Sequence, residues 1–93
     1  MNTQKDRIPA DNGDLSVSSR QNLVVGAKQL RKALNKGCVR RVYLARNADP
    51  ALTEPLVAMC RHNGVEFTWV RSMMDLGRAC GIEVGAATAA VVD

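Results

Sequence analysis

Short apolar runs alternate along the chain with segments of helical periodicity. The run Leu23–Val25 is too short for a helix and predicts a strand, and Gly26 then ends it with a turn. From position 27 to 36 the period becomes helical, because polar and basic residues cover one face while the other face carries Ala27, Leu30, Ala33 and Leu34. Gly37 suits a left-handed C-terminal cap. This stretch predicts a strand, a glycine turn and an amphipathic helix.

The rest of the chain repeats this arrangement. Asp49 and Pro50 are suited to the N-cap and first position of a helix, and Ser72 with Asp75 resembles a capping box. The periods between these signals predict helices over 50–63 and 72–80, ended by Gly64 and Gly81, and strands over Val39–Ala45, Val65–Val70 and Ala86–Val92. Strands that alternate with helices predict helices on both faces of one sheet.

Two aromatic residues lie in one of these strands. Alternation with period two places Val65, Phe67 and Trp69 on one face. The two rings could form a platform for stacked bases, but no run of glycine and aromatic residues typical of an RNA-binding strand accompanies them. We therefore expect both aromatics to pack in the core.

The first 21 residues carry weaker signals. Residues 1–14 mix Pro, Gly, Asn and nearly balanced charges, which predicts a flexible tail. Leu15–Gln21 could form a short helix with Leu15 and Val17 inward, although its serines disfavour it. With 93 residues and 46% hydrophobic content, the chain has room for one domain over residues 15–93 that can bury a core without metals or disulfides.

Charge is distributed unevenly along the chain. The net charge is +4, but no acidic residue lies between Leu15 and Ala48, where eight of the 13 cations are found: Arg20, Lys28, Arg31, Lys32, Lys36, Arg40, Arg41 and Arg46. Elsewhere 5 cations face 9 anions. Ordinary solvated helices mix the two signs, so this basic segment indicates a polyanionic partner.

Lys28 lies where a helix disfavours a cation. A helix N-terminus carries about +0.5 charge, so a nearby lysine costs about 0.3–1 kcal/mol. The free N–H groups there already form an anion site, and Lys28 and Lys32 would add to it if a phosphate or base edge docked. The alternative is that these lysines only solvate the outer face of the helix.

The loop Ile82–Val84 is a second unusual feature, because two branched apolar residues flank Glu83 between two glycines. These apolar side chains could simply dip into the core. If exposed, they would offer an apolar surface to an unstacked base, as recognition of single-stranded RNA requires.

Motifs for catalysis and metal binding are missing from the sequence. It contains no P-loop, no G-x-S-x-G and no G-x-G-x-x-G, and nothing in it indicates that Asp75 and Glu83 converge as a carboxylate pair. His62 is the only histidine, so we expect no enzyme activity, no cofactor and no metal. A reducing compartment and buried, unpaired thiols are expected for the three widely spaced cysteines Cys38, Cys60 and Cys80.

Nothing in the sequence indicates a membrane or a secretory route. No stretch approaches the roughly 18 apolar residues of a membrane span, and the first residues lack the apolar core of a signal peptide. We therefore expect a cytoplasmic protein.

Three segments together resemble a known family. They are residues 26–32 (Gly-Ala-Lys-Gln-Leu-Arg-Lys), the turn Ala45–Pro50, and residues 76–85 (Leu-Gly-Arg-Ala-Cys-Gly-Ile-Glu-Val-Gly). Over about residues 15–92 the chain resembles the ribosomal protein L-seven-Ae and L-thirty-e superfamily, especially its short bacterial members that bind kink-turn RNA. The resemblance implies an α/β fold, a three-layer α/β/α sandwich with a mixed four-stranded sheet. It implies as partner an RNA helix bent sharply at a short bulge flanked by sheared G·A pairs.

The resemblance also implies roles by position. Gly26 would allow close approach of the RNA backbone, Lys28 and Gln29 would address the guanine edges of the G·A pairs, and Lys32 would follow on the same face. The loop Ile82–Val84 would cover the extruded bulge nucleotide. The candidate RNA-binding residues are therefore Gly26, Lys28, Gln29, Arg31, Lys32, Lys36, Ile82, Glu83 and Val84.

One pair of residues departs from part of the family. Archaeal and eukaryotic relatives usually carry Asn-Glu where this chain has Lys28-Gln29, and an amide in place of a carboxylate changes how guanine donors are accepted. The Lys-Gln pair resembles the bacterial version, which keeps kink-turn binding as the expectation.

Two hypotheses about function follow. The first is a non-catalytic, monomeric protein that recognises kink-turn RNA, is ribosomal or ribosome-associated, and has no DNA or membrane partner. The alternative is a protein-interaction adaptor of the same fold with no specific RNA target. The basic segment favours RNA, whereas binding that is insensitive to salt would favour the adaptor.

Overall fold

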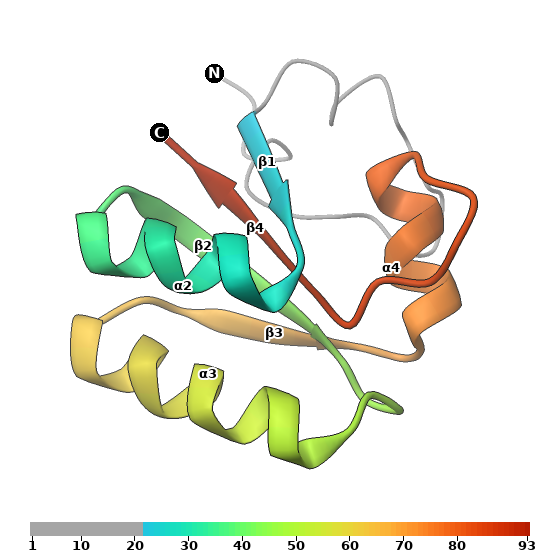
Figure 1. Cartoon of the computed structure of the whole chain (residues 1–93), viewed down its shortest axis with the longest axis horizontal. Helices are drawn as coiled ribbons and strands as arrows, with labels where there is room; N and C mark the ends of the chain where they lie inside the picture. Colours follow the sequence, from blue (N-terminus) through green and yellow to red (C-terminus); the bar gives the residue numbers. More distant parts are fainter. Residues whose placement is uncertain (1–21) are drawn as a thin grey trace.

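The computed structural model describes residues 22–93, in which strands and helices alternate (Figure 1). The elements are β1 (Asn22–Val25), α2 (Ala27–Lys36), β2 (Val39–Ala45), α3 (Pro50–Asn63), β3 (Phe67–Val70), α4 (Met73–Cys80) and β4 (Thr88–Val92). The predicted order of strands and helices is thereby confirmed. The tail expected over 1–14 and the short helix expected over Leu15–Gln21 lie outside the described residues.

The four strands form one mixed sheet in the order β1-β4-β2-β3. β4 lies between β1 and β2 and is antiparallel to both, whereas β2 and β3 are parallel. The last strand of the chain is thus an inner strand, which explains why its residues Thr88–Val91 are small or β-branched and fully buried.

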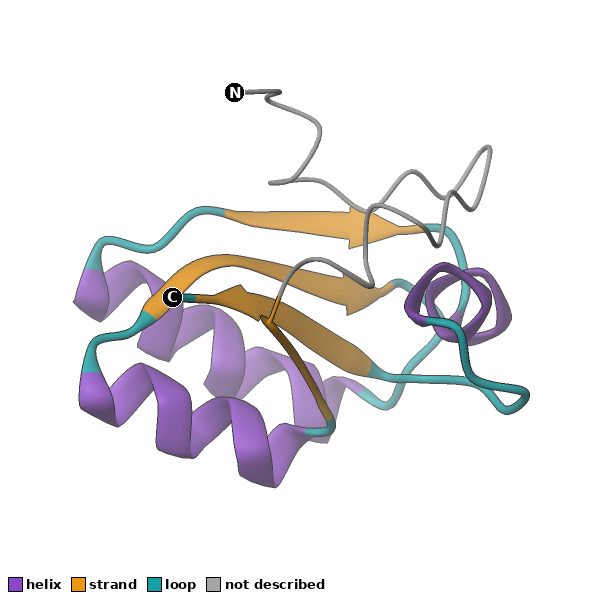
Figure 2. Ribbon diagram, turned by 90° about the horizontal axis from the view of Figure 1, so that it is seen from above, coloured by secondary structure: helices purple, strands orange, loops and turns teal. Residues whose placement is uncertain are grey.

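Helices cover both faces of the sheet, as the sequence predicts. α2 and α3 lie side by side against one face (Figure 2), where Leu30, Leu34, Leu56 and Cys60 pack on Val42 and other strand residues. α4 packs on the opposite face and contributes Leu76 and Ala79 to a second cluster around Tyr43. The predicted three-layer α/β/α arrangement is therefore confirmed.

The predicted helix ends are confirmed in detail. The side chain of Asp49 accepts a hydrogen bond from the N–H of Ala51 (2.9 Å), and the Ser72 hydroxyl accepts one from the N–H of Asp75 (3.1 Å). Gly37 ends α2 in the left-handed conformation, with φ of 73°. These residues could be identified from sequence because capping depends on neighbours within the same few residues.

The boundaries of two strands differ from the prediction. β3 begins at Phe67 and not at Val65, although the Glu66 carbonyl still accepts from the N–H of Val42 (3.1 Å). β4 begins at Thr88, because the N–H of Ala86 donates to the carbonyl of Met73 in α4 (2.9 Å). That bond turns the chain away from the sheet.

The prediction that both aromatic residues lie in the core is wrong for Trp69. Phe67 is half-buried on the α3 side of the sheet, but Trp69 remains 36% exposed, with its ring edge-to-face with that of Phe67 at 6.4 Å between centroids. β3 is an edge strand, so its residues have a neighbouring strand on one side only. The residue of β3 that is fully buried is Val70, on the opposite face against α4.

Candidate nucleic-acid interface

Strand direction brings the two predicted contact regions to one edge of the sheet. β1, β2 and β3 run the same way and β4 runs opposite to β1 and β2, so three strand C-termini and the start of β4 share that edge. The turn at Gly26, the β2–α3 turn and the loop between α4 and β4 all leave from it (Figure 1). We call it the loop edge, the kind of place where open α/β sheets bind ligands.

Gly26 has a backbone conformation that side chains rarely adopt, with φ of 105° and ψ of 147°. Its N–H donates to the carbonyl of Thr88 at the start of β4 (3.1 Å), and its carbonyl accepts from the N–H of Leu30 (3.0 Å). Among residues 22–93, no atom lies within 4 Å of the place that a Cβ atom at this position would occupy. The turn is therefore fixed to the sheet and open on its outer side, which leaves room for a partner's backbone.

In the described part of the chain, no side chain caps the N-terminus of α2, and the first turn of this helix contains no acidic residue. This differs from α3 and α4, which Asp49 and Ser72 cap. Lys28 and Gln29 are both exposed in that turn. Free N–H groups, the positive end of the helix dipole and a lysine together make this end of α2 strongly attractive to an anion or to an acceptor on a base.

The loop between α4 and β4 is held at several points. Gly81 ends α4 in the left-handed conformation, and the N–H of Ile82 donates to the carbonyl of Gly77 (3.1 Å). At the other end, the N–H of Ala45 donates to the carbonyl of Ala87 (2.9 Å). The side chains between these anchors point outward, since Ile82 is 37% and Val84 is 67% exposed. Of the two readings left open by the sequence, the structure supports exposure of the loop.

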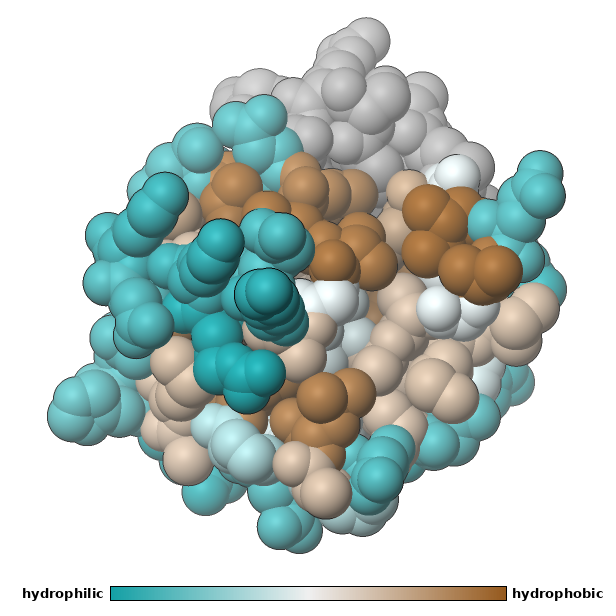
Figure 3. Space-filling view, in the orientation of Figure 1, coloured by the Kyte–Doolittle hydropathy of each residue, from teal (hydrophilic) through white to brown (hydrophobic). Residues whose placement is uncertain are grey.

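The structure brings some candidate residues together and separates another from them. Gly26, Lys28 and Gln29 share the loop edge with residues 82–84, and Arg31 and Lys32 follow along the exposed face of α2. Lys36 lies in the last turn of α2, at the far end of the helix. In Figure 3 hydrophilic residues gather over α2, while a hydrophobic patch covers the region of α4 and its following loop.

Two arginines that were not identified as site residues from the sequence lie next to this region, Arg71 directly after β3 and Arg78 in α4. Arg71 and Arg78 both pair with Asp75, at 3.0 Å and 3.4 Å. Hydrogen bonding by Arg71 is the main reason that the pKa of Asp75 lies below its ordinary value. A carboxylate with a lowered pKa is a poor general acid, so the arrangement gives no support to an acid–base pair of Asp75 and Glu83. The i,i+4 and i,i+3 spacings were the available sequence signal for these ion pairs.

Comparison with known proteins decides the family. The family model described as the Ribosomal protein L7Ae/L30e/S12e/Gadd45 family matches residues 12–93. The chain belongs to this family. It is similar to an RNA-binding protein of Bacillus pumilus, with 45% identity over 76 residues, or 82% of this chain and 93% of the relative. The RNA-binding protein YbxF of Geobacillus stearothermophilus is 40% identical over 70 residues, covering 75% of this chain and 85% of that protein.

Solved structures agree with this assignment. The 15.5kD RNA binding protein of Giardia lamblia superposes with a TM-score of 0.77 and 29% identity, covering 90% of this chain and 68% of that one. A Bacillus halodurans protein of unknown function has a TM-score of 0.78 and 26% identity, covering 94% of this chain and 87% of that one. The expected family and fold are therefore both confirmed.

The three cysteines are partly or fully buried. Cys60 is fully buried, while Cys38 and Cys80 are half-buried, so the prediction of buried thiols holds completely for one of the three. Burial raises the pKa of Cys80 to about 11 and also raises that of Cys60. A thiol with such a pKa is a weak nucleophile at neutral pH, which argues against a reactive role for Cys80.

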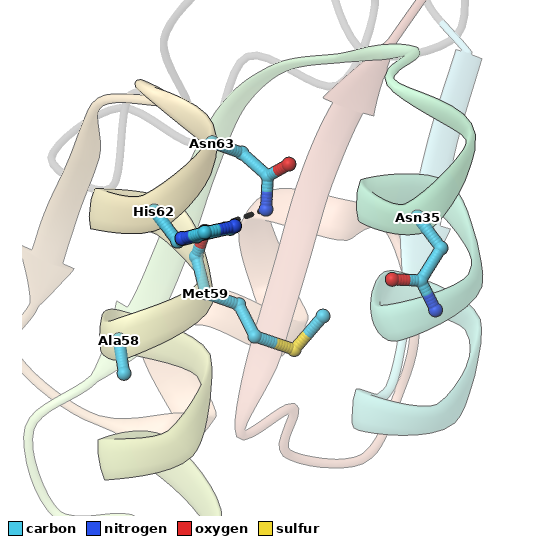
Figure 4. Close-up of a pocket in the computed structure, with 5 residues that line it drawn as sticks. All are labelled: Asn35, Ala58, Met59, His62 and Asn63. Carbon is cyan, nitrogen blue, oxygen red and sulfur yellow. Dashed lines mark hydrogen bonds between the residues drawn. The ribbon is translucent and has the colours of Figure 1, made fainter.

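An open groove of about 510 Å³ lies between the C-terminal ends of α2 and α3, away from the loop edge. Figure 4 shows its lining by Asn35, Ala58, Met59, His62 and Asn63, where the Asn63 amide donates to the Met59 carbonyl (2.7 Å). Within residues 22–93 no three His, Cys, Asp or Glu side chains come together to hold a metal ion. In the same range no helix has the length and apolar content that a membrane span needs.

Proposed function

We propose that this chain is a non-catalytic RNA-binding protein that recognises kink-turn RNA, and that it acts in or with the ribosome. Family membership and relatives named as RNA-binding proteins support the RNA partner. One observation carries the kink-turn part of the proposal: the uncapped N-terminus of α2 and the apolar loop at Ile82–Val84 project from the same edge of the sheet.

The two regions suit different parts of a bent RNA. Lys28, Gln29 and the free N–H groups of α2 can meet phosphates and the acceptors on guanine edges. The exposed side chains of Ile82 and Val84 can cover a nucleotide that has left the stack, which a continuous duplex does not present. Both contacts therefore form together only on the kinked conformer.

The mechanism is one of conformational selection. Basic residues along α2 raise the association rate and the affinity for any RNA, and this electrostatic part of the binding depends on salt. The hydrogen bond between Gly26 and Thr88 fixes one region relative to β4, and the bond between Ala45 and Ala87 fixes the other. Because the spacing between the two regions is fixed, binding stabilises the RNA conformer that matches it.

The decisive experiment compares two RNAs. Affinity is measured for a kink-turn RNA and for a matched duplex without the bulge, each at two salt concentrations. Preferential and salt-sensitive binding to the kinked RNA is the expected result. Equal binding to both would reduce the loop edge to a generic basic surface.

A protein-interaction adaptor is the second candidate, and the exposed apolar patch at Ile82 and Val84 is the observation that favours it. Failure to bind either RNA would support it. A partner protein bound with an affinity independent of salt would support it further.

A further inference from the structure

Arg46 lies at the loop edge, in the β2–α3 turn, and the proposed function does not yet use it. It directly follows Ala45, whose N–H donates to the carbonyl of Ala87 at the base of the apolar loop (2.9 Å). The next residue, Thr88, accepts the N–H of Gly26. Arg46 therefore lies beside the start of β4, close to the points that anchor both proposed contact regions.

The backbone around Arg46 is held by several hydrogen bonds. Its own N–H donates to the carbonyl of Val70 (2.8 Å), and the side chain of Asn47 accepts from the N–H of Met73 (2.8 Å). Ala48 is buried and its N–H donates to the carbonyl of Ala45 (3.2 Å). A side chain that extends from such a fixed base loses less conformational entropy when it binds a ligand.

Among the residues that the structure describes, the guanidinium of Arg46 has no partner, whereas those of Arg41, Arg71 and Arg78 are paired. Arg71 and Arg78 share the carboxylate of Asp75, and Arg41 pairs with Glu66 at 2.6 Å. Arg46 is exposed, and within residues 22–93 its side chain has no hydrogen bond or ion pair. A rigid backbone that displays an unpaired arginine is a typical arrangement for binding phosphate.

We propose that Arg46 binds phosphates of the RNA strand that carries the bulge, an inference that rests on the proposed function. A sharp bend brings the phosphates of two stems together and increases their repulsion. A planar guanidinium that contacts two phosphate oxygens reduces this repulsion where it is greatest. The clustered phosphates exist only in the bent form, so Arg46 contributes to selectivity for the kink as well as to overall affinity.

The test is Arg46→Gln, measured with the kink-turn RNA and with the matched duplex. We expect about a tenfold loss of affinity for the kinked RNA, as for removal of a charged hydrogen bond, and about a twofold loss at most for the duplex. Arg46→Lys should restore part of the preference, because the charge returns without the two-pronged geometry. Circular dichroism melts establish that each variant is folded.

Arg61→Gln is the matched control. It removes the same charge from the exposed end of α3, where the guanidinium lies 5.9 Å from the centre of the Phe67 ring, at the opposite edge of the sheet. It should weaken binding to both RNAs slightly and equally. If the wild-type protein prefers kinked RNA and Arg46→Gln keeps that preference, the inference about Arg46 is wrong but the proposed function stands. Equal binding of both RNAs by the wild type would overturn the proposed function, and the inference with it.

Discussion

The backbone carbonyl of Val84 lies so close to the Cα atom of Gly77 that a Cβ atom on Gly77 would be 2.0 Å from the Val84 oxygen. Gly77 is buried in the middle of α4, so this contact sets the loop after α4 directly on the helix backbone. Real Cβ atoms do not approach an oxygen this closely, and glycine is therefore required. The exposed side chains of Ile82 and Val84 owe their fixed position to this packing.

Gly77→Ala should lower the free energy of unfolding by about 1–3 kcal/mol, although alanine is the better helix former, because the loop must move away from the added methyl group. For a domain of this size, each kcal/mol corresponds to a fall of about 4–8 °C in melting temperature. Thermal and urea denaturation measure the loss. The displaced loop should also reduce the preference for kinked RNA.

Gly85→Ala tests a milder steric clash than Gly77→Ala. Its Cβ would lie 3.1 Å from the Cβ of Met73, a crowded distance that a small shift can relieve. The loss of stability should therefore be clearly smaller than for Gly77→Ala. A larger loss from Gly85→Ala would mean that the contact between Gly77 and Val84 does not hold the loop.

Gly26→Ala tests backbone conformation without steric crowding. The position has a φ of 105°, and no atom of the described residues lies within 4 Å of the place for a Cβ, so the expected cost of about 1–3 kcal/mol comes from the strained backbone alone. RNA affinity should fall as well, because relief of the strain would tilt the first turn of α2. Gly37→Asn is the control, since φ of 73° and ψ of 25° are values that asparagine tolerates. If Gly37→Asn lowers the free energy of unfolding as much as Gly26→Ala does, this reasoning is wrong.

Local features of this chain could be predicted from its sequence. The helix caps at Asp49 and Ser72 and the glycine ends of the helices depend on residues three or four positions apart. Alternation of apolar periods was sufficient for the order of strands and helices. The shared edge of Gly26 and Ile82–Val84 followed only from the resemblance to a family, because no local pattern specifies strand order.

Features that depend on tertiary neighbours escaped the sequence analysis. Period-two alternation correctly grouped Phe67 with Trp69 but could not show that their strand lies at the sheet edge, where Trp69 stays exposed. The need for glycine at position 77 arises from a backbone seven residues further along the chain. The position of Arg46 at the loop edge also depends on strand order, since its backbone is held by Val70 at the end of β3.

Two lysines of α2 should account for part of the salt dependence. Lys28→Ala with Lys32→Ala should lower RNA affinity and reduce the slope of log affinity against log salt by about one per lost phosphate contact. Lys36→Ala should change the slope least, because Lys36 lies in the last turn of α2, away from the loop edge. Titrations at four or more salt concentrations give the slopes. If the double variant keeps the wild-type slope, α2 is not the docking helix.

Asp75 should make the free energy of unfolding depend on pH in the acidic range. Hydrogen bonding by Arg71 lowers its pKa in the folded state, so its contribution is present above the pKa of the unfolded chain and is lost as pH falls through the folded value. Asp75→Asn should therefore reduce the melting temperature at about pH 6, and the difference from the wild type should shrink as pH falls through the folded-state pKa of Asp75. Arg71→Gln should reduce the same pH dependence. A difference between wild type and Asp75→Asn that is constant with pH would exclude this origin.

Val84→Asp should separate kink selectivity from general affinity. The side chain is 67% exposed, so the substitution should leave stability within about 0.5 kcal/mol. A carboxylate cannot replace the apolar contact with an unstacked base and repels phosphate, so affinity for kinked RNA should fall much more than affinity for the duplex. Met74→Asp gives the same change of charge at another exposed apolar residue, on α4 and outside the loop. It should lower the affinity for both RNAs to a similar extent. Equal losses on both RNAs for Val84→Asp would remove the loop from the recognition of the bulge and leave α2 as the main binding surface.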